Sequence, residues 1–283
     1  MKLLTVAGIF CALALTATAA RSQTVPTAGA WTIDASRNSD STVNFEIRID
    51  RPGDHSNWGN DEDWNRLQGL SRSAVFSAGS TVHFDLVRDA GTLRCSGYVA
   101  NGSGGGTFQY SPNPRFADEL ASRGVSRPSA DEQARMTYSG VSLALVDTLR
   151  RYGYAGLTPE DLIRLTNHGV TQQYVSAIEA AGYHPGSAEE LIRMVDHGVT
   201  TQYISAMRGL GYRPSAEELT RLVDHGVTAD FTRTMISFGY HPSTDELVRL
   251  ADHGVTPEFV RHLRSRGYNA SIEELIRLRD AGV

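Results

Sequence analysis

A period of 28 or 29 residues dominates the C-terminal part of this chain. A Gly-Val pair recurs at intervals of 29, 29, 28, 28 and 28 residues, and the additional residue Gly186 accounts for the change of interval. A Gly-Tyr pair keeps the same period and begins at Gly153, Gly182, Gly211, Gly239 and Gly267. Self-similarity with a period in this range is the signature of stacked repeat proteins, so it restricts the fold more than any other feature.

Helix caps predict two short helices in each repeat. Ser187 and Glu190 have the spacing of a capping box, in which serine and glutamate satisfy backbone amides at a helix start. The glycine of the Gly-Val pair accepts the left-handed conformation that ends this helix. A threonine then starts the second helix, which ends at Gly-Tyr. The capping box recurs at Ser129/Glu132, Ser215/Glu218, Ser243/Glu246 and Ser271/Glu274, with Thr158/Asp161 as a variant.

Stacking of these helices predicts a solenoid over residues 113–283. Helices of about ten residues are marginal alone, so they persist only by burying one face against neighbouring repeats. Five full repeats lie between Pro128 and Tyr268, and a half repeat adjoins each end, at 116–125 and 271–283. We expect the last half repeat to act as a cap, because Arg279 stands where internal repeats have valine or alanine.

Residues 21–112 alternate apolar and polar side chains, which predicts half-buried strands. We expect a small antiparallel sheet of four or five strands, with 101–106 as a turn, and therefore an α+β chain. A polar segment, Asp54 to Asn65, is interpreted as a loop. It is either a solvated loop pinned by Trp58 and Trp64 or a calcium or carbohydrate site, since carboxylates and amides suit a hard cation.

The N-terminus predicts export. Residues 1–20 combine a basic start, a short apolar run and small residues before a cleavage point, as a secretory signal peptide does. No second apolar segment follows, so we expect no membrane span and a periplasmic or secreted protein. The formal net charge of -5 argues against nucleic-acid binding, which needs a basic face. Cys95 is the only cysteine after the signal peptide, and it is interpreted as a small buried hydrophobe.

Two stripes of polar side chains are predicted on the exposed side of the array. Histidines one repeat apart cannot share a metal ion, because stacked helices lie about 8–10 Å apart and zinc ligands lie about 2 Å from the ion. The arginines have acidic residues four positions earlier, as in Glu189 and Arg193, which favours ion pairs within a helix. The stripes are nonetheless the candidate partner-binding surface: Arg164, Arg193, Arg221, Arg249, Arg277, His168, His197, His225 and His253.

No catalytic motif is present in the sequence, and no metal or cofactor is expected. The leading hypothesis is a non-enzymatic module that binds a protein or peptide. A metal-dependent or hydrolytic activity in the polar segment of the β region is the first alternative. A purely structural spacer is the second.

A resemblance adds to this interpretation. The phrase from Asp252 through Gly254-Val255-Thr256-Pro257 to Gly267-Tyr268 resembles repeats in exported bacterial proteins that accompany membrane zinc metallopeptidases of the β-lactam-sensor type. The strands between Val82 and Tyr110 are similar to the small domain before such repeats. The resemblance implies the accessory, outward-facing part of an envelope sensing system. The peptidase's His-Glu-x-x-His motif is absent from this sequence, so no activity is implied.

Overall fold

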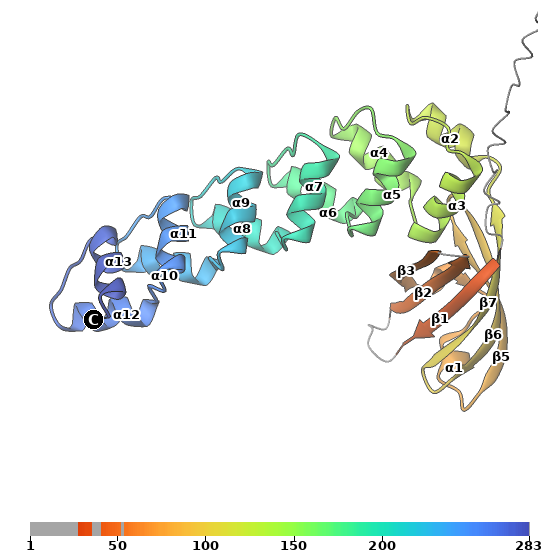
Figure 1. The fold of residues 1–283 in the computed structure, drawn as a ribbon, viewed down its shortest axis with the longest axis horizontal. Coiled ribbons are helices and arrows are strands. Elements are labelled where there is room, and N and C mark those ends of the chain that lie inside the picture. Colours follow the sequence, from red (N-terminus) through yellow and green to blue (C-terminus); the bar gives the residue numbers. More distant parts are fainter. Residues whose placement is uncertain (1–27, 36–40, 52–53, 283) are drawn as a thin grey trace, which may run out of the picture.

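The computed structural model describes residues 28–35, 41–51 and 54–282, and these form a curled β-sheet followed by a row of paired helices (Figure 1). The predicted α+β class is confirmed. The predicted signal peptide, residues 1–20, lies outside the described residues. No described helix combines the length and the hydrophobicity that a membrane span requires.

The described residues form one antiparallel sheet in the order β3-β2-β1-β7-β6-β5-β4, rather than the four or five strands expected. The polar sequence of β3 and the shortness of β4 hid these two edge strands from the alternation pattern. A helical turn, η1 (Trp64–Arg66), and a short helix, α1 (Arg72–Val75), interrupt the strand series. The strands are β1 (Ala28–Asp34), β2 (Thr42–Arg51), β3 (Asp54–Asp63), β4 (Leu67–Gln68), β5 (Ser80–Arg88), β6 (Gly91–Ala100) and β7 (Ser103–Pro112).

The sheet curls around an aromatic core. Three strands separate β2 from β5, yet the rings of Phe45 and Phe84 are 6.1 Å apart, and Trp31 contacts both. Glycines allow this curl: a Cβ on Gly106 would lie 2.0 Å from the Ser96 carbonyl oxygen. The predicted turn at 101–106 is therefore only partly right, because β7 already begins at Ser103.

The helices form two parallel rows that extend away from the sheet (Figure 1). One row contains the first helix of each repeat, and each member packs on the next: α3 (Ala130–Ser139), α5 (Pro159–Asn167), α7 (Ala188–Asp196), α9 (Ala216–Asp224), α11 (Thr244–Asp252) and α13 (Ile272–Asp280). The other row contains the second helices: α4 (Leu143–Arg151), α6 (Gln172–Ala180), α8 (Thr201–Gly209), α10 (Ala229–Ser237) and α12 (Pro257–Ser265). A shorter helix, α2 (Phe116–Ser122), precedes them.

Capping follows the sequence closely. Complete capping boxes start α3, α5, α9, α11 and α13. The box predicted at Ser187 is incomplete: Ser187 accepts from the Glu190 amide, but the Glu190 carboxylate accepts from the Gly186 amide instead. The inserted glycine presents its own amide to Glu190 and so displaces the reciprocal bond. The loop that leads into the third repeat therefore departs from the regular pattern.

Helix α3 joins the sheet to the array. Ala134 and Tyr138 belong to the core of the sheet, and the Tyr138 ring contacts Trp58, Phe108 and Tyr110. The opposite face of α3 contributes Met136 to the helical core. One helix thus belongs to two cores, so the sheet closes the first end of the array as a packed body.

Candidate functional site

The arginine stripe connects neighbouring repeats. Arg164, Arg221 and Arg249 each pair with a carboxylate on the following first-row helix, at N–O distances of 2.7, 2.7 and 2.5 Å. Glu189 therefore pairs with Arg164 of the preceding repeat and not with Arg193, so the predicted pairing within a helix is wrong at this position. Hydrogen bonding to Glu189 raises the pKa of Arg164, which keeps it charged. Arg193 forms no ion pair among the described residues, and Arg277 Nε lies 3.4 Å from the Glu273 carbonyl oxygen in its own helix.

The histidine stripe connects the repeats in the same way. Each histidine is the C-cap residue of a first-row helix, and its Nδ1 contacts the aspartate that ends the next helix of that row. The Nδ1–Oδ1 distances are 2.8, 2.6, 2.6 and 2.8 Å for His168–Asp196, His197–Asp224, His225–Asp252 and His253–Asp280. Most of the candidate partner-binding residues thus already bind the adjacent repeat.

The sheet and the array are also joined by a buried arginine. The Arg88 side chain at the end of β5 is 1% exposed, and its Nη2 lies 2.5 Å from Glu62 Oε1 in β3. Its Nη1 donates to the carbonyl oxygens of Thr137 and Tyr138, at the C-terminal end of α3. A cation is favoured at this end of a helix, where carbonyl groups lack partners. Arg88 therefore ties two strands to the first helix of the array.

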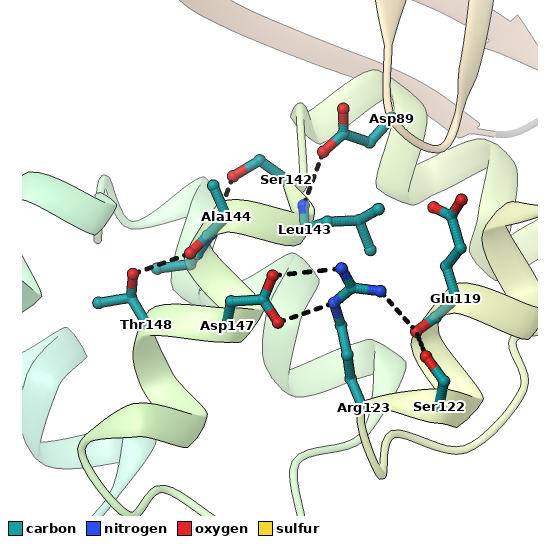
Figure 2. A network of polar contacts seen from close by, with 10 residues as sticks. Asp89, Glu119, Ser122, Arg123, Ser142, Leu143, Ala144, Asp147 and Thr148 are labelled. Atoms are coloured by element: carbon teal, nitrogen blue, oxygen red, sulfur yellow. Dashed lines mark hydrogen bonds and ion pairs between the residues drawn. The ribbon is translucent and has the colours of Figure 1, made fainter.

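A second polar network lies beside this pair (Figure 2). Asp89 Oδ2 accepts from the Leu143 amide at 2.7 Å, so a residue of the turn between β5 and β6 satisfies a free amide at the start of α4. Arg123 holds both carboxylate oxygens of Asp147, at 2.8 and 3.2 Å, and donates to the Glu119 carbonyl oxygen. Hydrogen bonding to Asp147 raises the pKa of Arg123. The junction is therefore fixed from several directions.

Between the sheet and the first repeats lies a cleft of about 460 Å³, here named the junction cleft. Asp61, Glu62, Asp63 and Arg66 line its sheet side. The helical side is lined by Ser139, Gly140, Ser142, Ala144, Leu145, Thr166 and Gly169 to Gln173. Asp63 is exposed and precedes η1 without accepting a capping hydrogen bond, so its charge faces solvent. The sequence did not reveal the cleft because residues of its two walls lie at least 50 positions apart in the chain, from Asp89 to Ser139.

The polar segment predicted as a loop is strand β3, and this prediction is wrong. It pairs with β2 along its whole length, from Arg51↔Asp54 to Thr42↔Asp63. Trp58 and Trp64 pack against the sheet core, as the interpretation of a segment pinned by these two side chains predicted. Because β3 ends the strand order, its outer backbone edge is not paired within the sheet. Among the described residues, no three His, Cys, Asp or Glu side chains are placed to share a metal ion.

Two titratable groups are buried, and the sequence predicted one of them, Cys95, but not the other, Glu179. Cys95 is 2% exposed, and burial raises the pKa of its thiol, as expected for a packing residue. Glu179 in α6 has a side chain that is only 1% exposed, and no sequence pattern singled it out. It accepts from the Tyr154 hydroxyl at 3.4 Å and contacts His184 Nδ1. Burial and this carboxylate raise the pKa of Tyr154, so the hydroxyl keeps its proton.

Comparison of the chain with protein-family models, with curated proteins and with solved structures gives no match.

Proposed function

We propose that this protein is an exported, non-enzymatic module that binds an extended basic segment of a partner protein along β3, with the partner's cationic side chains in the junction cleft. One observation carries the proposal: among the described residues, β3 is an edge strand of the sheet, and it runs into a cleft partly lined by carboxylates. An extended peptide can add to such an edge through main-chain hydrogen bonds. The carboxylates then select a basic sequence by charge.

The rigid junction supports this proposal. The buried Arg88–Glu62 pair and the two cores that share α3 fix the walls of the cleft relative to one another. A preformed site loses less entropy on binding than a flexible one. The arginine and histidine stripes then have a different role, which is to hold successive repeats in register.

A peptide of alternating arginine and valine, measured by fluorescence anisotropy with the full chain, tests the proposal. We expect saturable binding that weakens as salt rises, because exposed charges are screened. The Asp61→Asn/Asp63→Asn double variant should bind at least about tenfold more weakly, as loss of charge-assisted contacts implies. Glu217→Gln removes an exposed carboxylate on α9 and should change nothing.

Two peptide controls separate the alternatives. A peptide of alternating glutamate and valine should not bind. Two further peptides carry N-methyl groups on alternate amides, one on the odd and one on the even positions. Alternate amides of an added strand face β3, so one of these two peptides should lose binding and the other should keep it. Equal binding by both methylated peptides would exclude strand addition. Equal binding by the double variant would exclude the cleft.

A further inference from the structure

Arginines of two repeats fill the space at the end of the preceding second-row helix. The Arg264 guanidinium lies 5.3 Å from the ring centroids of both Phe238 and Tyr240, and it donates to the Phe238 carbonyl oxygen. Arg208 lies 5.8 Å from the Tyr183 ring centroid and donates to the Ala181 carbonyl oxygen. A cation is favoured both over an aromatic ring and at a helix C-terminus.

The same place after α4 has the aromatic rings without the arginine. Tyr152 and Tyr154 occupy the positions that Phe238 and Tyr240 occupy after α10. The residue equivalent to Arg264 is Glu179, the eighth residue of its helix. The eighth residues of the five second-row helices are Arg150, Glu179, Arg208, Ile236 and Arg264. The chain therefore provides a carboxylate and two rings where it elsewhere provides a cation and two rings.

A cavity of about 700 Å³ opens at this place, between the loops 152–157 and 184–189. Both loops are one residue longer than the corresponding later loops, through Gly156 and Gly186. In later repeats the tyrosine closes this space: Tyr240 donates to the Ala270 carbonyl oxygen at 2.7 Å, and Tyr212 donates to that of Pro242 at 2.6 Å. Tyr154 donates to Glu179 instead, so the space stays open.

His184 covers the Glu179 carboxylate. Its Nδ1 contacts Glu179, while the side chain itself is 74% exposed and lines the cavity. The imidazole can therefore leave without opening the helical core. Its departure would present a buried carboxylate beside the rings of Tyr152 and Tyr154. The carboxylate would then keep the neutral Tyr154 hydroxyl as a partner but would have lost its imidazole. A buried charge in such a place is costly, so a cation should replace the imidazole.

We propose that this cavity binds the guanidinium group of a ligand beside Glu179. The bound guanidinium would occupy a place that corresponds to those of the Arg208 and Arg264 guanidinium groups in later repeats. Guanidinium fits better than ammonium because its planar fork can stack on a ring and pair with a carboxylate at once. Glu179 lies behind the lining residues Tyr154 and His184. Asp161 and Glu189 line the cavity and add negative potential, although each already accepts a hydrogen bond, from Thr158 and Arg164 respectively. The cavity shares no lining residue with the junction cleft, so this inference is independent of the proposed function.

Isothermal titration calorimetry of the full chain tests the inference with matched probes. One is an alanine-arginine-alanine peptide with blocked ends, and its partner has citrulline, the uncharged isostere, in place of arginine. We expect the arginine peptide to bind at least about tenfold more tightly, as the loss of a charge-assisted bond predicts. Free arginine is the third probe. Tighter binding of the peptide indicates a partner protein as the source of the guanidinium, and tighter binding of free arginine indicates a small molecule.

Two variants connect binding to Glu179. Glu179→Gln keeps the shape and removes the charge, so the arginine peptide should bind at least about tenfold more weakly. Glu179→Arg supplies the guanidinium internally, so it should raise the thermal midpoint and abolish binding. The second variant keeps the test decisive if the first folds poorly. Glu217→Gln should bind as the unaltered chain does. Equal affinity for arginine and citrulline peptides, no binding at about millimolar ligand, or full binding by Glu179→Arg would overturn the inference.

Discussion

Arg88 Nη2 and Glu62 Oε1 lie 2.5 Å apart, in a place from which solvent is almost fully excluded. The same guanidinium satisfies two carbonyl oxygens of α3, so one side chain connects strand, strand and helix. Burial makes this pair differ from the exposed pairs of the array. The two classes should respond differently to substitution.

Glu62→Gln should destabilise the chain by about 3–5 kcal/mol, because it leaves a buried guanidinium without a counter-charge. Arg66→Ala is the control: its Nη1 lies 3.9 Å from Glu62 Oε2 and its side chain is 42% exposed, so the cost should stay below about 1 kcal/mol. Urea unfolding followed by circular dichroism measures both. Similar costs for the two variants would contradict a dominant role for the buried pair.

Glu273 makes the stability of the array depend on pH. Hydrogen bonding to Arg249 lowers the pKa of this carboxyl from its ordinary 4.5. The folded chain thus holds this proton less tightly than the unfolded chain, so the stabilisation is present above pH 4.5 and is lost as the pH falls through the lowered value. Thermal midpoints between pH 7 and pH 3 should fall less steeply for Glu273→Gln than for the unaltered chain. Parallel curves would show that the pair contributes nothing.

Substitution by alanine should change the free energy of unfolding in opposite directions at two glycines. Gly198 follows α7 with φ at +73°, and a Cβ there would meet no atom within 4 Å, so the cost of Gly198→Ala is conformational and should be about 1–2 kcal/mol. Gly209 ends α8 without a positive φ and also has open space, so Gly209→Ala should stabilise by up to about 1 kcal/mol. Chemical denaturation of both variants measures the signs, and equal signs would contradict this assignment.

Removal of 271–283 should expose apolar surface of the last full repeat. Leu275 and Ile276 of α13 are 1% and 4% exposed and share a core with Phe259 and Leu263. Arg279 lies over Phe259, 5.6 Å from the ring centroid, so a charged residue also covers this core. The truncated chain should have a lower thermal midpoint and should associate in light scattering. An unchanged midpoint with monomeric behaviour would mean that α13 does not cover the repeat.

Cys95 should be inert in the folded chain. Its burial and raised pKa leave almost no accessible thiolate. Iodoacetamide should modify it rapidly in concentrated urea and very slowly in buffer, as mass spectrometry can follow. Fast modification without denaturant would place the thiol at the surface.

The array could be predicted from the sequence because its signals are local. Capping residues and glycines mark each helix within a few positions, and a repeated spacing multiplies the signal. The stripes of arginine and histidine were also visible. Their partners were not visible. An acidic residue four positions before Arg164 suggests a pair within the helix, whereas Arg164 pairs with Glu189 of the next repeat.

The sheet and the candidate sites were harder to predict, because they depend on long-range contacts. Strand β3 is almost entirely polar, so the alternation that reveals strands is absent, and only its pairing with β2 makes it a strand. Glu179 appears in the sequence as an ordinary helical glutamate. Only comparison with Arg208 and Arg264, at the corresponding places in the structure, shows that a carboxylate replaces a cation here.

The contacts that join each repeat to the next have a mechanical consequence. Helices of the same row make their main contacts with their immediate neighbours, so tension applied at α13 acts mainly on one interface at a time. Each repeat that yields releases 28 or 29 residues, which is roughly 95–100 Å of extended chain at about 3.4 Å per residue. The elongated part of the molecule is therefore built to lengthen in nearly equal steps. The buried pair at Arg88 marks the point where such a stepwise extension would meet a different resistance.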